Sequence, residues 1–206
     1  MQPTSPRTDL RRPAALCLVA APLLLALGDL AGVLTRRETI LWTVLLFLSF
    51  CAFVPAIFAL AHLVRARAPR AGLVLGSIAF LGAMAGASMQ AFFRAALLLE
   101  QASTSPAVAA AAEKAWSVPS FFLTTVAPGL LFPLGMLSLG VALVLGRQVP
   151  LAASLLLCLG ALLFPVGHAV GLPVALLGGD LVLLAALAWI ASVVLAKPGT
   201  WEHRDL

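Results

Sequence analysis

Charged residues are scarce in this chain of 206 residues. Only 10% of the residues are Asp, Glu, Lys or Arg, whereas 62% are hydrophobic. Soluble domains are about one quarter charged and about half apolar, so a soluble globule of this composition would expose much apolar surface. The composition therefore excludes an ordinary soluble protein and predicts a polytopic membrane protein.

Motifs of enzyme active sites are also missing. The sequence contains no GxSxG, HExxH or P-loop motif, and no GxGxxG in the context of a strand. Cys17, Cys51 and Cys158 lie inside apolar segments without a CxxC pair, which is typical of small core or lipid-facing residues. We therefore expect no catalytic residues, no metal ligands and no cofactor, and the sequence does not indicate an enzyme.

The net charge of +5 does not point to nucleic acid. The basic residues form short clusters at the ends of apolar segments, without the aromatic-interleaved basic face of a nucleic-acid-binding protein. Such clusters are typical membrane topology signals. The partners we expect are the lipid bilayer and, within it, other membrane proteins or further copies of the chain.

Six apolar segments of membrane length follow one another. They cover about residues 14–34, 40–64, 71–99, 119–146, 150–170 and 173–196. Their lengths suit helices that cross a hydrocarbon core of about 30 Å, the longer ones with tilt. The longest stretch outside them, about residues 101–118, leaves no room for a soluble catalytic domain. The fold class expected is all-α, a single six-helix transmembrane bundle over residues 1–206.

The basic residues also predict the orientation of this bundle. With the N-terminus inside, nine of them fall on the cytoplasmic side and three on the opposite side. Because Lys and Arg are enriched in cytoplasmic loops, this bias favours N-in and C-in. The nine are Arg7, Arg11, Arg12, Arg65, Arg67, Arg70, Arg147, Lys197 and Arg204, and the three are Arg36, Arg37 and Lys114.

The first segment could instead be a cleaved signal peptide, since basic residues precede an apolar run. That run is long for a signal peptide, and residues 29–31, Asp-Leu-Ala, make a poor cleavage site. We therefore expect the first segment to be a membrane span.

Prolines and glycines predict where helices bend and approach. Pro128 and Pro133 interrupt the fourth segment, and each removes a backbone hydrogen bond, so we expect this helix to kink. Pairs of glycines four residues apart let membrane helices come close together. Such pairs are Gly28 and Gly32, Gly72 and Gly76, and Gly82 and Gly86.

Ionisable residues inside three apolar segments need a physical reason. A charged side chain in hydrocarbon costs roughly 2–3 kcal/mol on insertion scales. From the helical rise, Asp29 and Arg94 lie about 8 Å inside the outer ends of their segments, and Asp180 about 10 Å. His168 is slightly shallower, and Gln90 shares a helical face with Arg94 through i,i+4 spacing. We expect these five residues to form one polar layer in the outer half of the bilayer.

Two interpretations of this layer remain open. In the structural one, Arg94 bridges Asp29 or Asp180 and fixes the helices in register. In the functional one, the layer is a polar cavity, open to the outside, that binds a small solute or relays protons. The protein is then either a non-enzymatic accessory or interaction protein, or a small-solute or proton-coupled transporter.

A third interpretation, an intramembrane enzyme or haem protein, is less favoured. His62 and His168 invite it as axial ligands of a haem iron. They lie near opposite ends of their segments, separated by most of the bilayer, so they are not expected to ligate one iron.

Two short stretches resemble other proteins. Arg67-Ala-Pro-Arg70-Ala-Gly72 and Gly167-His168-x-x-Gly171-x-Pro173 are similar to segments of small multi-pass proteins of the inner membrane of GC-rich bacteria. These proteins have no established activity, so no functional residue is carried over. The resemblance implies a multi-pass protein of the bacterial inner membrane.

Overall fold

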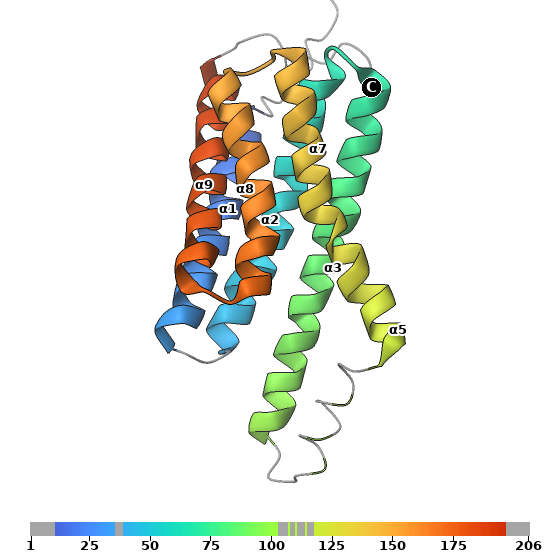
Figure 1. The fold of residues 1–206 in the computed structure, drawn as a ribbon, viewed down its shortest axis with the longest axis vertical. Coiled ribbons are helices and arrows are strands. Elements are labelled where there is room, and N and C mark those ends of the chain that lie inside the picture. The colour runs from blue at the N-terminus through green and yellow to red at the C-terminus, as the bar shows by residue number, and fades with distance from the viewer. Residues whose placement is uncertain are drawn as a thin grey trace, which may run out of the picture.

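A computed structural model describes residues 11–35, 39–102, 107, 110, 114 and 118–196. Within them, six helices are long and apolar enough to cross a membrane, as the sequence predicts (Figure 1). They belong to an all-α bundle, and the described residues contain no strand. The elements are α1 (Arg11–Thr35), α2 (Ile40–Arg65), α3 (Pro69–Ala102), α5 (Pro119–Phe121), the π-helical turn η1 (Phe122–Val126), α6 (Ala127–Gly129), α7 (Leu131–Gly146), α8 (Leu151–Val170) and α9 (Pro173–Ala196).

The helices form a closed ring. Each long helix packs against the next one along the chain, from α1 through α2, α3, α7 and α8 to α9, and α9 returns to α1. Short connections make neighbouring helices antiparallel. An even number of crossings therefore brings the start of α1 and the end of α9 to the same end of the bundle (Figure 1).

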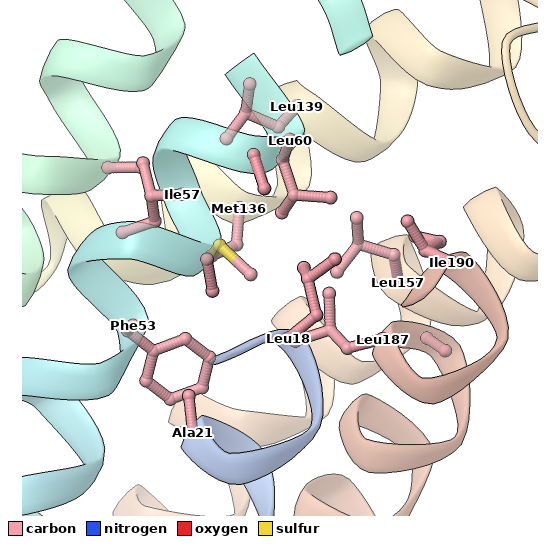
Figure 2. Packing of buried hydrophobic residues seen from close by; sticks show 14 of the residues in the cluster. Leu18, Ala21, Phe53, Ile57, Leu60, Met136, Leu139, Leu157, Leu187 and Ile190 are labelled. Carbon is pink, nitrogen blue, oxygen red and sulfur yellow. The ribbon is translucent and has the colours of Figure 1, made fainter. Parts of the chain in front are cut away.

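Apolar side chains fill the middle of this ring. Figure 2 shows Leu18 of α1, Phe53 and Leu60 of α2, Met136 of α7 and Leu187 of α9 pointing toward one another. Each of these side chains is fully buried. Leucines on the outer faces of the same helices are exposed, which is the pattern of a bundle surrounded by lipid.

Glycines bring α1 and α2 together, as their spacing predicts. A Cβ atom on Gly28 would lie 2.9 Å from Cδ2 of Leu46, and one on Gly32 would lie 3.0 Å from Cδ1 of Trp42. A side chain at Gly28 would displace Leu46, and one at Gly32 would crowd Trp42, so the two glycines favour this close approach. The same holds for Gly82, which lies against the backbone of span four at Phe132.

The fourth span differs from the single helix expected over 119–146. It is broken into α5, η1, α6 and α7, and the part of membrane length is Ala127–Gly146. Pro128 and Pro133 have no N–H to donate to the carbonyls of Thr124 and Gly129, which interrupts the ladder of helical hydrogen bonds. The predicted kink is thus confirmed, and the helix is interrupted at Leu130, between α6 and α7. Figure 1 shows α5 bent away from the line of α7.

Local sequence signals mark the start of α2 and the end of α8. Thr39 precedes α2, and its hydroxyl oxygen accepts a hydrogen bond from the backbone N–H of Trp42 at 3.2 Å, as a helix N-cap does. At the end of α8, Gly171 takes the left-handed conformation, with φ of 67°, and starts the turn into α9. Trp42 in the first turn of α2 and His168 in the last turn of α8 therefore lie at the same end of the bundle.

Several of the basic residues that predict the orientation lie outside the described residues. They are Arg7, Arg36, Arg37, Lys197 and Arg204. The start of α1 and the end of α9 lie at one end of the bundle, but the side of the membrane that this end faces stays a prediction.

Candidate functional site: a buried carboxyl cluster

Asp29 is the centre of a group of polar side chains from four helices. It lies in α1 and is only 2% exposed. Its Oδ1 accepts a hydrogen bond from Nε1 of Trp42 on α2 at 3.3 Å, and its Oδ2 lies 3.5 Å from Nε2 of His168 on α8. Together with Asp180 of α9, these residues form what we call the carboxyl cluster.

Asp180 is the most deeply buried member of the cluster. Asp180 is 0% exposed, and its carboxyl group lies close enough to that of Asp29 for their charges to interact. Oδ2 of Asp29 and both carboxyl oxygens of Asp180 have no hydrogen-bond partner among the described residues. Ionised carboxylates have only acceptors, so the two acids cannot satisfy each other in that form.

His168 connects the buried acids with the exterior of the bundle. Its Nδ1 donates a hydrogen bond to the carbonyl oxygen of Phe164 at 2.9 Å, which fixes the proton on that nitrogen. Nε2 then faces Asp29 either as a second donor, in the imidazolium, or as an acceptor for a protonated carboxyl. The His168 side chain remains 37% exposed, so it is the accessible member of the cluster.

The charges of the cluster do not balance without an additional proton. Asp29 and Asp180 would carry two negative charges, and a protonated His168 supplies one positive charge. No guanidinium or ammonium group of the described residues forms an ion pair with either acid. The cluster therefore combines two buried acids with a single basic side chain among the described residues.

Arg94 does not take the place that the structural interpretation gives it. It is exposed, and within the described residues it forms no ion pair with Asp29 or Asp180. The neighbouring residue, Phe93, turns toward α2 and packs edge-on against Trp42, with ring centroids 5.9 Å apart. Successive residues of a helix point about 100° apart, so Arg94 is directed to another side. The predicted ion-pair clamp is therefore wrong, because sequence depth does not fix the helical face.

Gln90 is buried but is not linked to the carboxyl cluster by any contact that the structure shows. It is 4% exposed, and its Oε1 has no hydrogen-bond donor among the described residues. It lies on the face of α3 that includes Gly86 and Phe93, which pack against Phe50 and Trp42 of α2. The structure thus brings Asp29, His168 and Asp180 together, but neither Gln90 nor Arg94.

The five residues of the predicted layer differ in exposure. Asp29, Gln90 and Asp180 are buried, whereas His168 and Arg94 are exposed. On the other side of the carboxyl cluster lies the apolar core, beginning with Leu25 of α1 and Leu183 of α9. The carboxyl cluster therefore lies between this core and the end of the bundle, and the cavity open to the outside stays a prediction.

Trp42 is the member of the cluster that sequence reasoning missed. The sequence places it near the outer interface, where tryptophans are common. The signal that could have found it is the pair Gly28 and Gly32 on either side of Asp29. A face of small residues lets the next helix approach closely, so a polar group on that helix can reach the acid.

The structure gives little basis for a metal or haem. Within the described residues, no group of three or more His, Cys, Asp or Glu side chains could hold a metal ion. His62 lies in the last turn of α2 and His168 in the last turn of α8. The antiparallel arrangement puts these turns at opposite ends of the bundle, so the two imidazoles cannot ligate one iron.

Comparisons with protein-family models, curated proteins and solved structures find no match for this chain. The carboxyl cluster itself is therefore the basis for a functional proposal.

Proposed function

We propose that this integral membrane protein is a proton-coupled carrier of small solutes. In this proposal, the pair of Asp29 and Asp180 binds the coupling proton, and His168 exchanges it with the solution at the end of the bundle. The single observation that carries the proposal is that an imidazole lies 3.5 Å from one of two buried acids, while no guanidinium or ammonium group of the described residues pairs with either acid. Intramembrane acids and histidines in such arrangements are typical of proton-binding sites in transporters.

A carrier must also change shape, and the broken fourth span offers a place for this. Phe132 follows the break directly, and its ring lies 5.7 Å from that of Phe164 on α8. Phe164 in turn stacks near the imidazole of His168, with centroids 4.5 Å apart, and its carbonyl oxygen holds Nδ1. A movement of span four relative to α8 would therefore shift Phe164 and, through it, His168 of the carboxyl cluster.

A second candidate is a non-enzymatic accessory protein of the inner membrane, as the resemblance of its short stretches implies. The observation that favours it is the apolar core next to the cluster, where Phe53, Met136 and Leu187 are fully buried and point toward one another. In that case the carboxyl cluster only fastens α1, α8 and α9 to one another.

Infrared spectroscopy and flux measurements separate the two candidates. The purified protein in vesicles is titrated from about pH 5 to about pH 9, and the carbonyl band of a protonated carboxyl group is followed. A panel of amines, amino acids and sugars is then tested for solute-dependent proton movement, using a pH-sensitive dye inside the vesicles. Asp180→Asn keeps the shape of the side chain but removes its proton exchange, and Arg94→Gln is the matched control outside the cluster.

A proton-coupled carrier requires a titrating carboxyl band that Asp180→Asn removes, and a proton flux that falls to the level of empty vesicles in that variant. Arg94→Gln should retain both signals. A protein whose band does not titrate, and in which no solute moves protons, is not a carrier, and the accessory role is then favoured.

A further inference from the structure

Four arginines gather at the end of the bundle opposite the carboxyl cluster. Arg65, Arg67 and Arg70 lie at the turn between α2 and α3, and Arg147 lies at the turn between α7 and α8. All four are exposed. We call this group the arginine end. The two turns touch, because a Cβ atom on Gly146 would lie 4.0 Å from Cγ of Arg67.

These guanidinium groups have no partners in the described part of the chain. None of the four forms an ion pair or a side-chain hydrogen bond with a described residue. The acidic residues of the described helices, Asp29, Glu100 and Asp180, lie toward the other end of the bundle. The arginine end is therefore a concentrated, accessible positive charge that attracts anions from outside these helices.

Arg147 occupies a backbone position that normally belongs to glycine. It caps α7 with φ of 50° and ψ of 36°, the left-handed conformation that strains any residue with a Cβ atom. The corresponding cap of α8 is Gly171, with φ of 67°. The fold thus has an unstrained solution for such a cap and retains an arginine at the turn next to Arg67. Backbone strain of this kind is concentrated at functional sites.

Apolar side chains next to the arginines are exposed as well. Leu145 is 79% exposed and lies two residues before Arg147, and Leu151 is exposed at the start of α8. Leu73 is exposed in the first turns of α3, close in sequence to Arg70. An occupant of this surface can therefore place a negative group on the arginines and an apolar chain on the leucines.

We propose that the arginine end binds an anionic phospholipid. Its phosphate lies between Arg67 and Arg147, and its acyl chains cover Leu145 and Leu151. Guanidinium groups bind phosphate oxygens through two parallel hydrogen bonds, and basic surfaces at the ends of membrane helices recognise anionic headgroups. This inference does not depend on the proposed carrier function, because the two sites lie at opposite ends of the bundle.

Thermal unfolding in lipid bilayers of defined composition tests the proposal. The full-length protein is placed in nanodiscs of phosphatidylcholine alone or of phosphatidylcholine with phosphatidylglycerol. Inorganic phosphate added to the phosphatidylcholine discs tests the headgroup chemistry without a lipid. We expect phosphatidylglycerol to raise the midpoint of unfolding by about 5 °C and free phosphate to have no comparable effect.

Substitutions of the arginines show which of them produce the shift in the unfolding midpoint. The double substitution Arg67→Gln with Arg147→Gln should remove the shift that phosphatidylglycerol produces. The single substitution Arg147→Gly should lose part of that shift while unfolding no earlier than the wild type in phosphatidylcholine, because it relieves the left-handed cap. Arg12→Gln is the matched control, since Arg12 is exposed at the same end of the bundle but outside the two touching turns.

Three outcomes contradict the proposal. An undiminished phosphatidylglycerol shift in the double variant would mean that these arginines do not bind the lipid. An equal loss in Arg12→Gln would mean that the charge of the whole end acts without a defined site. An equal shift with free phosphate would identify a small-anion site instead of a phospholipid site.

Discussion

The two ends of the bundle hold their charges in opposite ways. At one end, Asp29 and Asp180 are buried, and Asp29 accepts a hydrogen bond from an indole and lies 3.5 Å from an imidazole. At the other end, the arginines are exposed on two turns and pair with no described residue. The first arrangement is held by desolvated contacts between helices, and the second by water, lipid and counterions.

This difference determines what a substitution can change. Removing a member of a buried polar group leaves its partners without water and without hydrogen bonds, so the loss of stability is large. Removing an exposed charge lets water replace it, so the loss is small, while effects on orientation and on lipid binding remain. The following expectations test this contrast, from the largest effect to the smallest.

The orientation of the two ends should give an all-or-none result. Alkaline phosphatase is active only outside the cytoplasm, and the basic bias predicts that the end with the carboxyl cluster faces outward. A fusion after Ser105 should therefore be active, and fusions after Gln148 and after Leu206 should be inactive. The reverse pattern would place the arginine end outside and would overturn the N-in and C-in prediction.

Truncation of an acid should cost far more stability than truncation of an arginine. Asp29→Ala leaves Nε1 of Trp42 and the carboxyl group of Asp180 without their partner, and we expect a loss of about 2–3 kcal/mol. For a chain of this size this corresponds to a fall in the unfolding midpoint of roughly 5–10 °C. Arg67→Ala in neutral detergent should stay within about 0.5 kcal/mol of the wild type. Similar losses in both variants would show that burial does not distinguish the two ends.

A double-mutant cycle should show which base is the partner of Asp29. Asp29→Asn combined with His168→Gln should give a coupling energy of about 0.5–1.5 kcal/mol, because the two side chains are in contact. Asp29→Asn combined with Arg94→Gln should be additive. Coupling to Arg94 with none to His168 would restore the ion-pair clamp and contradict the geometry of the carboxyl cluster.

The smallest effect is expected at the strained cap of α7. Arg147→Gly removes the clash of Cβ in the left-handed conformation and should raise stability in neutral detergent by about 0.5–1 kcal/mol. Gly171→Ala is the opposite change at the equivalent cap of α8 and should lower stability by a similar amount. If both substitutions changed the stability in the same direction, the left-handed caps would not carry the strain described above.

Much of the fold is predictable from the sequence because the bilayer demands it. Five of the six long helices begin and end within three residues of the expected limits. The reason is that the local sequence determines both the length of an apolar run and the ends of its helix. The kink at Pro128 and Pro133 and the close approach at Gly28 and Gly32 are confirmed for the same reason. The fourth span shows the limit, because a helix with two internal prolines can break in several ways, and contacts such as that of Gly82 select one.

The candidate site is predicted only in part. Depth along each helix can be counted, so Asp29, His168 and Asp180 are correctly assigned to one level. The rotation of each helix depends on packing with its neighbours, and this rotation turns Arg94 away and brings Trp42 in. Charge complementarity suggested Arg94 as the partner of the acids, yet Phe93 takes the position toward Trp42.

The sequence by itself determined that this protein is a helical membrane protein with six spans. Hydrocarbon accepts only structures whose backbone hydrogen bonds are satisfied internally, and continuous apolar runs of about 20 residues satisfy them as helices. Only the tertiary structure decided which polar groups meet. Contacts between membrane helices depend on the fit of their surfaces, and that fit placed His168 and Trp42 on Asp29, set Asp180 beside it and left Arg94 outside.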